Sequence, residues 1–223
     1  MTVSSPRRSA TRQRLYQAAV TLFAEQGVSA TSVEQIAERA GVAKGTVYYN
    51  FSSKTELFEA LLRDGIEPLT AALRRSVGTA PGGALAALEG MTDAGLAFVA
   101  EHPDLVRLLV AEQWRSSRPW HPTLVAVRRQ VAGVVRGVLE DGVKSGELRA
   151  DLDVELTSGA LVGMVVLGAL DWQTFHPERR PAEVRRALSV VLRGQLAAAP
   201  GRHEDGRHED GRNEGGRDED GRR

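Results

Sequence analysis

Apolar residues recur with a helical period along most of the chain. Near the N-terminus, five of them occupy positions i, i+3, i+4, i+7 and i+8, which form one stripe on a helix. These residues are Leu15, Ala18, Ala19, Leu22 and Phe23. Gly27 follows as a helix stop signal. No segment shows the alternation of a β-strand, so the pattern predicts an all-α protein.

Two short helices and a longer one are predicted next. Thr31-Ser32-Val33-Glu34 has the Ser/Thr-x-x-Glu form of a capping box, in which a hydroxyl and a carboxylate bond the free backbone donors. This helix ends at Gly41, and the segment AKGTVYYNF begins another shortly afterwards. Ser53-Lys54-Thr55-Glu56 is a second capping box, and it opens a helix that continues toward Leu73 with a kink at Pro68.

The chain from residue 66 to residue 200 is predicted to form a helical bundle. Gly82-Gly83 precedes one helix, and His102-Pro103 begins the next. The polar segment RSSRPWHP separates that helix from a long one through Leu139. Residues 153–175 and then an amphipathic segment ending near Leu196 complete the predicted bundle.

The helix predicted over 153–175 is apolar on almost every side, so it has to be buried on almost every side. In a bundle of this size, one face can serve the core and the other a partner subunit. Gly159, Gly163 and Gly168 permit close approach of a second helix. The alternative is a central helix within a monomer.

Composition limits the function classes. The 223 residues are 42% hydrophobic and 26% charged, with 29 basic and 29 acidic side chains, so any nucleic-acid face has to be local. Residues 1–63 hold eight basic and five acidic side chains, a net charge of +3. The absence of cysteine excludes a disulfide scaffold, a Cys-ligated zinc site and a thiol nucleophile.

The two ends of the chain are predicted to lie outside the folded domains. Residues 1–9 are expected to form a flexible arm, without the apolar stretch of a signal peptide. Residues 201–223 repeat arginine every five positions, contain no apolar side chain and carry a net charge of −2, which predicts disorder. His203 and His208 in this tail could alternatively form a metal-binding segment, but a low-complexity repeat already explains their positions.

The apolar run Leu156–Leu170 is shorter than the ~20 residues that a bilayer requires, so the expected location is the cytoplasm.

The helix predicted over 44–50 has more polar reach than a short core helix needs. Its long or polar side chains are Lys44, Thr46, Tyr48, Tyr49 and Asn50. Gly45 leaves its first turn without side-chain bulk, which permits close approach to a nucleic-acid backbone. Two short helices joined by a glycine turn and resting on a longer helix form a helix-turn-helix pattern.

The stretch TSVEQIAERAGVAKGTVYYNFSSKTELFEALL resembles the signature of the TetR family of bacterial transcriptional regulators. The similarity is specific over residues 10–65, in the Thr-x-x-x-x-Ile-Ala spacing, the Gly-Thr-x-Tyr-Tyr-x-Phe segment and the lysine that follows it. Ala43 stands where the family usually has a capping serine, which should weaken that cap by ~1 kcal/mol. Asn50 stands where histidine is commonest.

The resemblance implies an operator-binding homodimer with a helix-turn-helix domain at 10–65 and a ligand-binding and dimerisation bundle at 66–200. The helix at 44–50 would enter the major groove, with Lys44 and Thr46 at base edges or adjacent phosphates. Tyr48 and Tyr49 would donate to phosphates, and packing alone is the alternative for Tyr48. The remaining phosphate contacts are assigned to the backbone N–H groups of Thr31 and Ser32 and to the Lys54 ammonium, for which a solvated lysine is the alternative.

Several large apolar side chains outside this domain could line a ligand cavity between bundle helices. They are Met91, Phe98, Trp114, Met164, Trp172 and Phe175. Core packing is the alternative for each of them. No cofactor or metal is expected, and no catalytic motif is present.

The sequence therefore predicts a dimeric repressor that a small apolar or amphipathic ligand releases from a pseudo-palindromic operator. A helical protein-interaction scaffold that retains the helix-turn-helix shape is the alternative. Lys44, Tyr48, Tyr49 and Lys54 around one turn favour the regulator, because a scaffold has no use for that combination.

Overall fold

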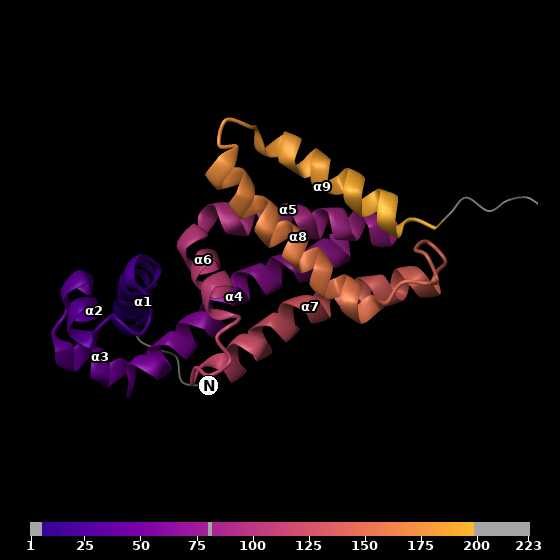
Figure 1. Cartoon of the computed structure of the whole chain (residues 1–223). Helices are drawn as coiled ribbons and strands as arrows, with labels where there is room; N and C mark the ends of the chain where they lie inside the picture. Colours follow the sequence, from indigo (N-terminus) through magenta and orange to yellow (C-terminus); the bar gives the residue numbers. More distant parts are fainter. Residues whose placement is uncertain (1–5, 80–81, 199–223) are drawn as a thin grey trace, which may run out of the picture.

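The computed structural model describes residues 6–79 and 82–198, and these residues form nine α-helices (Figure 1). The helices are α1 (Pro6–Gln26), α2 (Val33–Ala40), α3 (Lys44–Asn50), α4 (Lys54–Thr79), α5 (Gly83–Glu101), α6 (Pro103–Glu112), α7 (His121–Lys144), α8 (Val154–Phe175) and α9 (Pro181–Leu196). The described residues contain no β-strand, and one isolated bridge joins Leu148 to Ala197. The all-α prediction is confirmed.

Helices α1, α2 and α3 form a separate lobe at one end of the molecule (Figure 1). The helix-turn-helix angle is set by Gly41, whose φ of 62° lies in the left-handed region that favours glycine. The cap of α2 differs from the predicted one by one residue. Ser32 accepts from the backbone N–H of Gln35, and the Gln35 side chain accepts from the Ser32 N–H. Gln35 thus takes the role predicted for Glu34, since an amide oxygen serves the same donor.

Helix α4 connects this lobe to the rest of the molecule. Ser53 caps it by accepting from the Glu56 N–H at 3.1 Å, and the helix continues past Pro68 to Thr79. The boundary predicted between residues 65 and 66 therefore lies inside one continuous helix. Helix α1 begins at Pro6, inside the segment predicted as an arm, and the predicted tail at 201–223 lies outside the described residues.

The bundle is built around α4, α5, α7 and α8, whose apolar side chains form one core with those of the N-terminal lobe. Helix α9 packs on α5 through charged as well as apolar contacts. Arg193 forms a bidentate pair with Glu89 at 2.5 and 2.7 Å, and Arg185 contacts Asp93 at 2.7 Å. Arg193 lowers the pKa of the Glu89 carboxyl through these hydrogen bonds.

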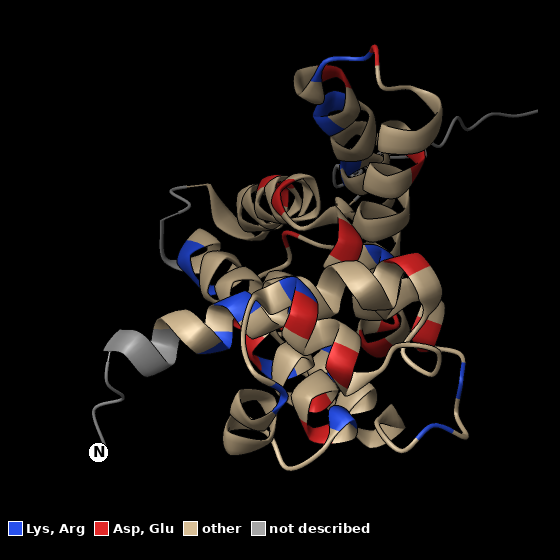
Figure 2. Cartoon of the chain, turned by 90° about the vertical axis from the view of Figure 1, so that its left-hand side faces the viewer, with Lys and Arg blue, Asp and Glu red and all other residues tan. Residues whose placement is uncertain are grey.

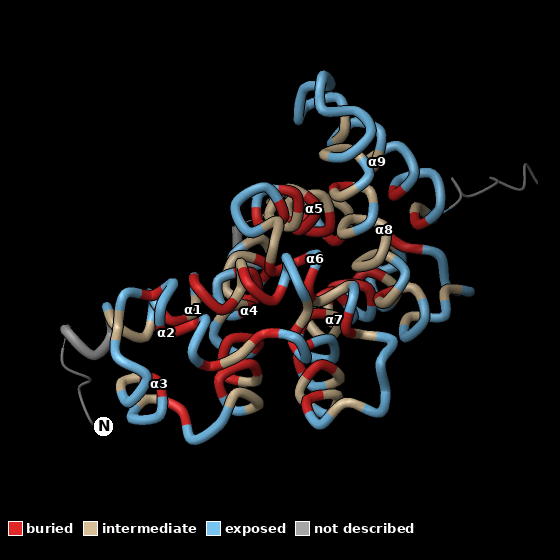
Figure 3. Tube along the Cα trace, turned by 60° about the vertical axis from the view of Figure 1, so that its left-hand side comes forward, coloured by how far each residue is buried: buried red, intermediate tan, exposed pale blue. Residues whose placement is uncertain are grey.

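Most residues of helix α8 are only partly buried in the single chain, and several are exposed (Figure 3). Ser158 and Ala169 are its buried residues, while Leu156 and Phe175 are 72% and 69% exposed. Val190 and Val191 extend the exposed apolar surface onto α9. The complete burial expected for α8 is therefore not achieved within one chain.

Two helices, α5 and α8, are long and apolar enough to cross a membrane by length and composition. The helical segment of α8 is 22 residues long, so it exceeds the shorter run that the sequence suggests. Core helices of soluble proteins pass the same test, and α5 carries eight buried side chains of the bundle core.

Candidate DNA-binding face and ligand cavity

Helix α3 directs Val47 inward and exposes its longest side chains on the surface of the N-terminal lobe. Val47 is buried, whereas Tyr49 is 74% exposed and Tyr48 is about half exposed. Gly45 has open space where a Cβ would lie, so a nucleic-acid backbone can approach this turn closely. The hydroxyl groups of Tyr48 and Tyr49 are therefore accessible on the folded helix.

Lys44, at the first position of α3, forms an ion pair with Glu34 of α2 and lies over the Tyr48 ring at 5.9 Å. The hydrogen bond from Lys44 lowers the pKa of Glu34, and the same bond raises the pKa of Lys44. Lys44 is therefore charged and exposed, but it is already paired with the Glu34 carboxylate of the same chain.

Thr46 and Asn50 are half-buried on α3. The Asn50 side-chain amide donates to the Thr46 carbonyl oxygen at 2.8 Å, and its own oxygen is buried without a partner among the described residues. Asn50 is thus held against α3, with less freedom to reach a base edge than the sequence suggests.

Lys54, at the first position of α4, directs its ammonium at the loop between α1 and α2. It donates to the carbonyl oxygens of Val28, Ser29 and Thr31 at 2.8, 3.2 and 2.6 Å. Burial lowers the pKa of Lys54, whereas the three carbonyl oxygens favour its charged form. Lys54 therefore fixes the loop that precedes α2, a role that the sequence does not reveal.

The predicted donors before α2 also have internal partners. The Thr31 side chain is buried, and its hydroxyl donates to the Gly27 carbonyl oxygen at 2.9 Å. The Thr31 N–H bonds the Gly27 carbonyl oxygen at 3.3 Å, and the Ser32 N–H bonds Gln35 at 2.8 Å. This corrects their assignment as free phosphate donors. The N–H groups in the first turn of α2 have no backbone acceptor within the helix, and that of Glu34 bonds its own carboxylate.

A second anchor that sequence reasoning missed joins α1 to α4. The Tyr16 hydroxyl donates to Asp64 at 2.5 Å, and Arg12 donates to the Tyr16 oxygen at 2.8 Å. The Arg12 guanidinium also lies over the Phe51 ring, 4.7 Å from its centre. Burial and the hydrogen bond to Asp64 raise the pKa of Tyr16. The spacing of Arg12 and Tyr16 on one helix face is the single local signal of this cluster.

Charge on the N-terminal lobe is mixed. Seen from that end of the molecule, acidic and basic segments are interspersed along the ribbon (Figure 2). Arg39 pairs with Glu25, Lys44 with Glu34, and Arg12 with Asp64. A DNA-binding surface on this lobe would therefore depend on individual hydrogen-bond donors, because its described residues form no continuous basic patch.

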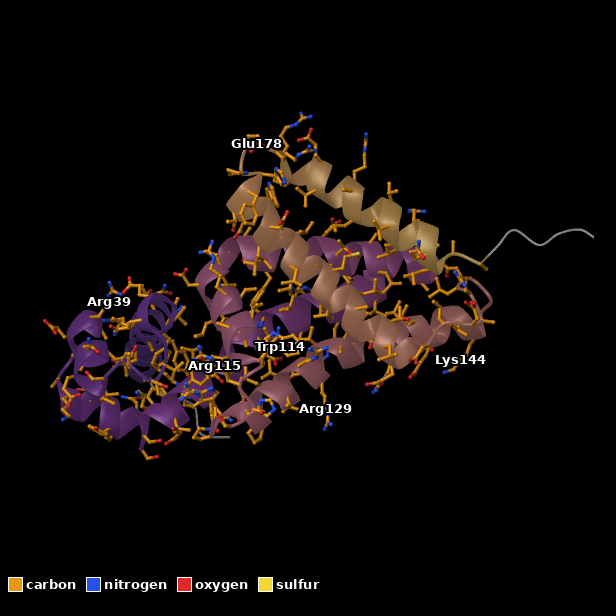
Figure 4. The ribbon with its side chains drawn as sticks, in the orientation of Figure 1. Arg39, Trp114, Arg115, Arg129, Lys144 and Glu178 are labelled. Carbon is orange, nitrogen blue, oxygen red and sulfur yellow. The ribbon has the colours of Figure 1, made fainter. Side chains whose placement is uncertain are left out.

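An apolar cavity of about 160 Å³ lies among α4, α5, α6, α7 and α8. Ile66 and Leu69 of α4 form part of its wall, together with Phe98 of α5. Its wall reaches the surface at Trp114, which is 77% exposed and lies where α6 ends and the chain turns toward α7 (Figure 4). Such a concave, mostly apolar space is suited to a small ligand.

The structure separates the predicted ligand residues into three places. Phe98 and Trp114 line this cavity, while Met91 and Met164 line a smaller one of about 50 Å³ beside it. Trp172 and Phe175 line neither cavity, which corrects their assignment. They lie at the end of α8, where the Trp172 ring N–H donates to the Arg179 carbonyl oxygen at 3.0 Å.

Trp120 links the cavity region to the N-terminal lobe. Its ring N–H donates to the buried Glu112 carboxylate at 3.1 Å, and its ring meets Phe58 of α4 edge-on at 5.0 Å. Phe58 in turn contacts Phe23 of α1 at 5.4 Å. His121, the next residue, lines the cavity, and its Nδ1 is buried without a partner among the described residues.

Two family models match this chain. Residues 15–61 match the bacterial regulatory proteins of the tetR family, and residues 81–194 match the tetracyclin repressor-like C-terminal domain. The first range covers the lobe of α1, α2 and α3 and the start of α4. The second covers α5 to α8 and most of α9.

Relatives and solved structures agree with these matches. The transcriptional repressor KstR2 of Rhodococcus jostii is 35% identical over 156 residues, which are 67% of this chain and 73% of that protein. The structure of the ketosteroid regulator KstR2 of Mycobacterium tuberculosis has a TM-score of 0.68 and 27% identity, covering 89% of this chain and 98% of that one. FadR of Bacillus subtilis in complex with stearoyl-CoA shares the fold, with a TM-score of 0.72 at 21% identity over 81% of this chain and 96% of that one. The chain belongs to the TetR family of bacterial transcriptional regulators.

Proposed function

We propose that this chain acts as a cytoplasmic homodimeric repressor that binds a pseudo-palindromic operator and is released from it by a small ligand. Family membership makes it a DNA-binding, ligand-responsive regulator and disfavours the scaffold alternative. The observation that carries the proposal is helix α3, which buries Val47 and presents Tyr48 and Tyr49 next to a turn open to close approach.

The proposed contacts to DNA follow the exposure of the side chains. Lys44 and Thr46 would meet base edges or adjacent phosphates, and Tyr48 and Tyr49 would donate to phosphates. The first turn of α2 would offer its N–H groups to another phosphate, favoured by the positive end of the helix dipole. Lys54 would act in part by fixing the loop before that turn.

Dimerisation is supported by the exposed apolar surface of α8 and α9. Leu156, Leu167 and Phe175 on α8 and Val190 and Val191 on α9 are each at least half exposed in the single chain. Exposed large apolar side chains on two neighbouring helices are typical of a subunit interface. A second copy would complete the burial that α8 lacks.

The apolar cavity is proposed as the effector site. Its wall includes both α4, which leads to the DNA-binding lobe, and the bundle helices. The KstR2 structure is described as a ketosteroid regulator, and FadR is described in complex with stearoyl-CoA. Both of those molecules have a large apolar part, which supports an apolar or amphipathic effector here. The relatives are regulators, and we propose no catalytic activity for this chain.

Selection of bound fragments from the source genome tests this function directly. We expect recovered fragments to share a pseudo-palindrome whose half-sites are one helical turn apart, ~34–36 Å, or a multiple of it. Footprinting should show symmetric protection of both half-sites by a dimer. A single asymmetric half-site protected by a monomer, or recovery of fragments without a common sequence, would contradict the proposal.

A further inference from the structure

We propose that Arg128 selects effectors that carry an anionic head group on an apolar body. The inference rests on the proposed effector cavity and adds the chemical class of its ligand. Arg128 is on α7, and it lines the apolar cavity together with Leu124 and Val131 of the same helix.

The charge of the cavity wall is one-sided. Arg128 is its fully charged residue, His121 is its other titratable one, and no acidic side chain is among the described residues that line it. An entering carboxylate or phosphate therefore meets an opposite charge and no like charge on the cavity wall itself, while Glu155 lies in the adjoining groove. A cation would instead be repelled by Arg128, and the apolar wall could not solvate it.

Arg128 is also available for a ligand, unlike Arg115 and Arg136. Arg115 contacts Glu112 at 3.3 Å, and Arg136 contacts Glu155 at 2.8 Å. No hydrogen bond or ion pair joins Arg128 to any residue in the described part of the chain. Its guanidinium lies over Gly159 of α8, where an added Cβ would be 3.3 Å from Nη2.

The position of Arg128 marks the boundary between two environments. It lines the apolar cavity and also a polar groove between α7 and α8, which contains Arg129, Glu155 and Ser158. An apolar body in the cavity would therefore place its head group beside an exposed guanidinium. A guanidinium can bind a carboxylate or phosphate with two parallel hydrogen bonds.

The size of the cavity sets the size of the probe. A dry cavity of ~150 Å³ accommodates benzene, and the cavity here is about 160 Å³, so an eight-carbon chain is a suitable first probe. Octanoate, octyl phosphate and 1-octanol present the same tail with a carboxylate, a phosphate or a neutral head group. Binding of each to the full-length protein is measured by calorimetry at low and high salt.

Arg128→Gln is compared with Arg129→Gln, which changes the adjacent arginine that lies on α7 outside the cavity wall (Figure 4). We expect octanoate and octyl phosphate to bind wild type about tenfold more tightly than 1-octanol, a preference that salt weakens. Arg128→Gln should remove this preference and leave 1-octanol binding unchanged, which also shows that the variant is folded. Arg129→Gln should retain the preference.

The possible failures distinguish this inference from the proposed function. Equal binding of all three probes to wild type would overturn the role of Arg128 and leave the effector cavity in place. Equal loss of the preference in both variants would overturn its assignment to Arg128. No binding of any probe would contradict the effector cavity itself. A preference for the phosphate over the carboxylate, or the reverse, identifies which anion the site takes.

Discussion

We propose that the ion pair between Lys44 and Glu34 makes DNA binding an exchange, in which Lys44 replaces a carboxylate partner with DNA. Lys44 is exposed and charged, but in the free protein its partner is a carboxylate of α2. A phosphate or base edge has to replace that carboxylate, which remains nearby as a negative charge. We therefore expect Glu34 to oppose binding and to limit nonspecific affinity for DNA.

Replacing Glu34 with Gln tests this exchange. We expect Glu34→Gln to raise affinity for DNA of any sequence about two- to fivefold, the range of exposed ion pairs. The gain should shrink in a Lys44→Met background, since the released lysine is then absent. Glu38→Gln removes an exposed acid from the same helix without touching Lys44 and is the control, measured by fluorescence anisotropy. An equal gain for Glu38→Gln would show that only net charge matters.

The Lys54 ammonium fixes the loop before α2, and we propose that it also contacts a DNA phosphate. Lys54→Met should lower the melting temperature without DNA, because three carbonyl oxygens lose a donor and unsatisfied groups cost ~1–3 kcal/mol. It should also weaken all DNA sequences equally and lower the salt slope by about one, as for a phosphate contact. A lower melting temperature with an unchanged salt slope would leave Lys54 with the structural role alone.

For single residues, the sequence predicts which side chains are exposed, but it does not predict their hydrogen-bond partners in the free protein. The polar character of α3 correctly indicates that Tyr48 and Tyr49 are exposed around a buried Val47. The partners of Lys54 are 23 to 26 residues away, so no local pattern contains them. Trp172 and Phe175 are likewise misplaced in the prediction, because the choice between cavity and helix end depends on tertiary packing.

Glycines on one helix can have opposite effects on stability. Gly142, near the end of α7, would place a Cβ 2.6 Å from the Ala84 Cβ of α5 and 2.6 Å from a methyl of Leu148. Gly137, one and a half turns earlier, has open space at the same atom. Close approach of α7 to the start of α5 therefore requires glycine at the first position and not at the second.

Alanine substitutions at these two glycines should move stability in opposite directions. We expect Gly142→Ala to destabilise the protein by ~1–3 kcal/mol through overpacking. Gly137→Ala should stabilise it by ~0.5–1 kcal/mol, because alanine has less backbone freedom to lose. Denaturant unfolding of both variants is the measurement. Stabilisation by Gly142→Ala would show that α5 and α7 are not packed this closely.

Among whole elements, most described helices are predicted from an apolar stripe and a stop signal, whereas α3 is predicted from its motif and α8 from its continuous apolar run. Periodicity predicts less well where a helix begins and what covers its surface. The cap of α2 uses Gln35 because the chain enters that helix one residue later than the Thr31 pattern indicates. The apolar run of α8 predicts burial, but within the single chain Ser158 and Ala169 are its buried residues.

At the scale of the whole molecule, cavity and DNA-binding lobe share α4. Ile66 and Leu69 of this helix line the cavity, while Lys54 and Phe58 at its other end contact the lobe. Trp120 adds a second contact through Phe58. A ligand that tilts α4 would therefore shift the lobe, and in a dimer it would change the separation of the two α3 helices. A rigid duplex fixes that separation, so a misfit loses phosphate contacts.

Paired titrations measure whether effector binding and operator binding are coupled. Octanoate is titrated into the protein with and without an operator recovered from the genome, and operator into the protein with and without octanoate. Allosteric coupling is typically ~1–3 kcal/mol, so we expect each partner to weaken the other by the same factor, about 5- to 150-fold. Tryptophan fluorescence should report the ligand through Trp114 in the cavity wall. Equal octanoate affinity with and without operator would contradict the account, because the ligand would then bind without regulating.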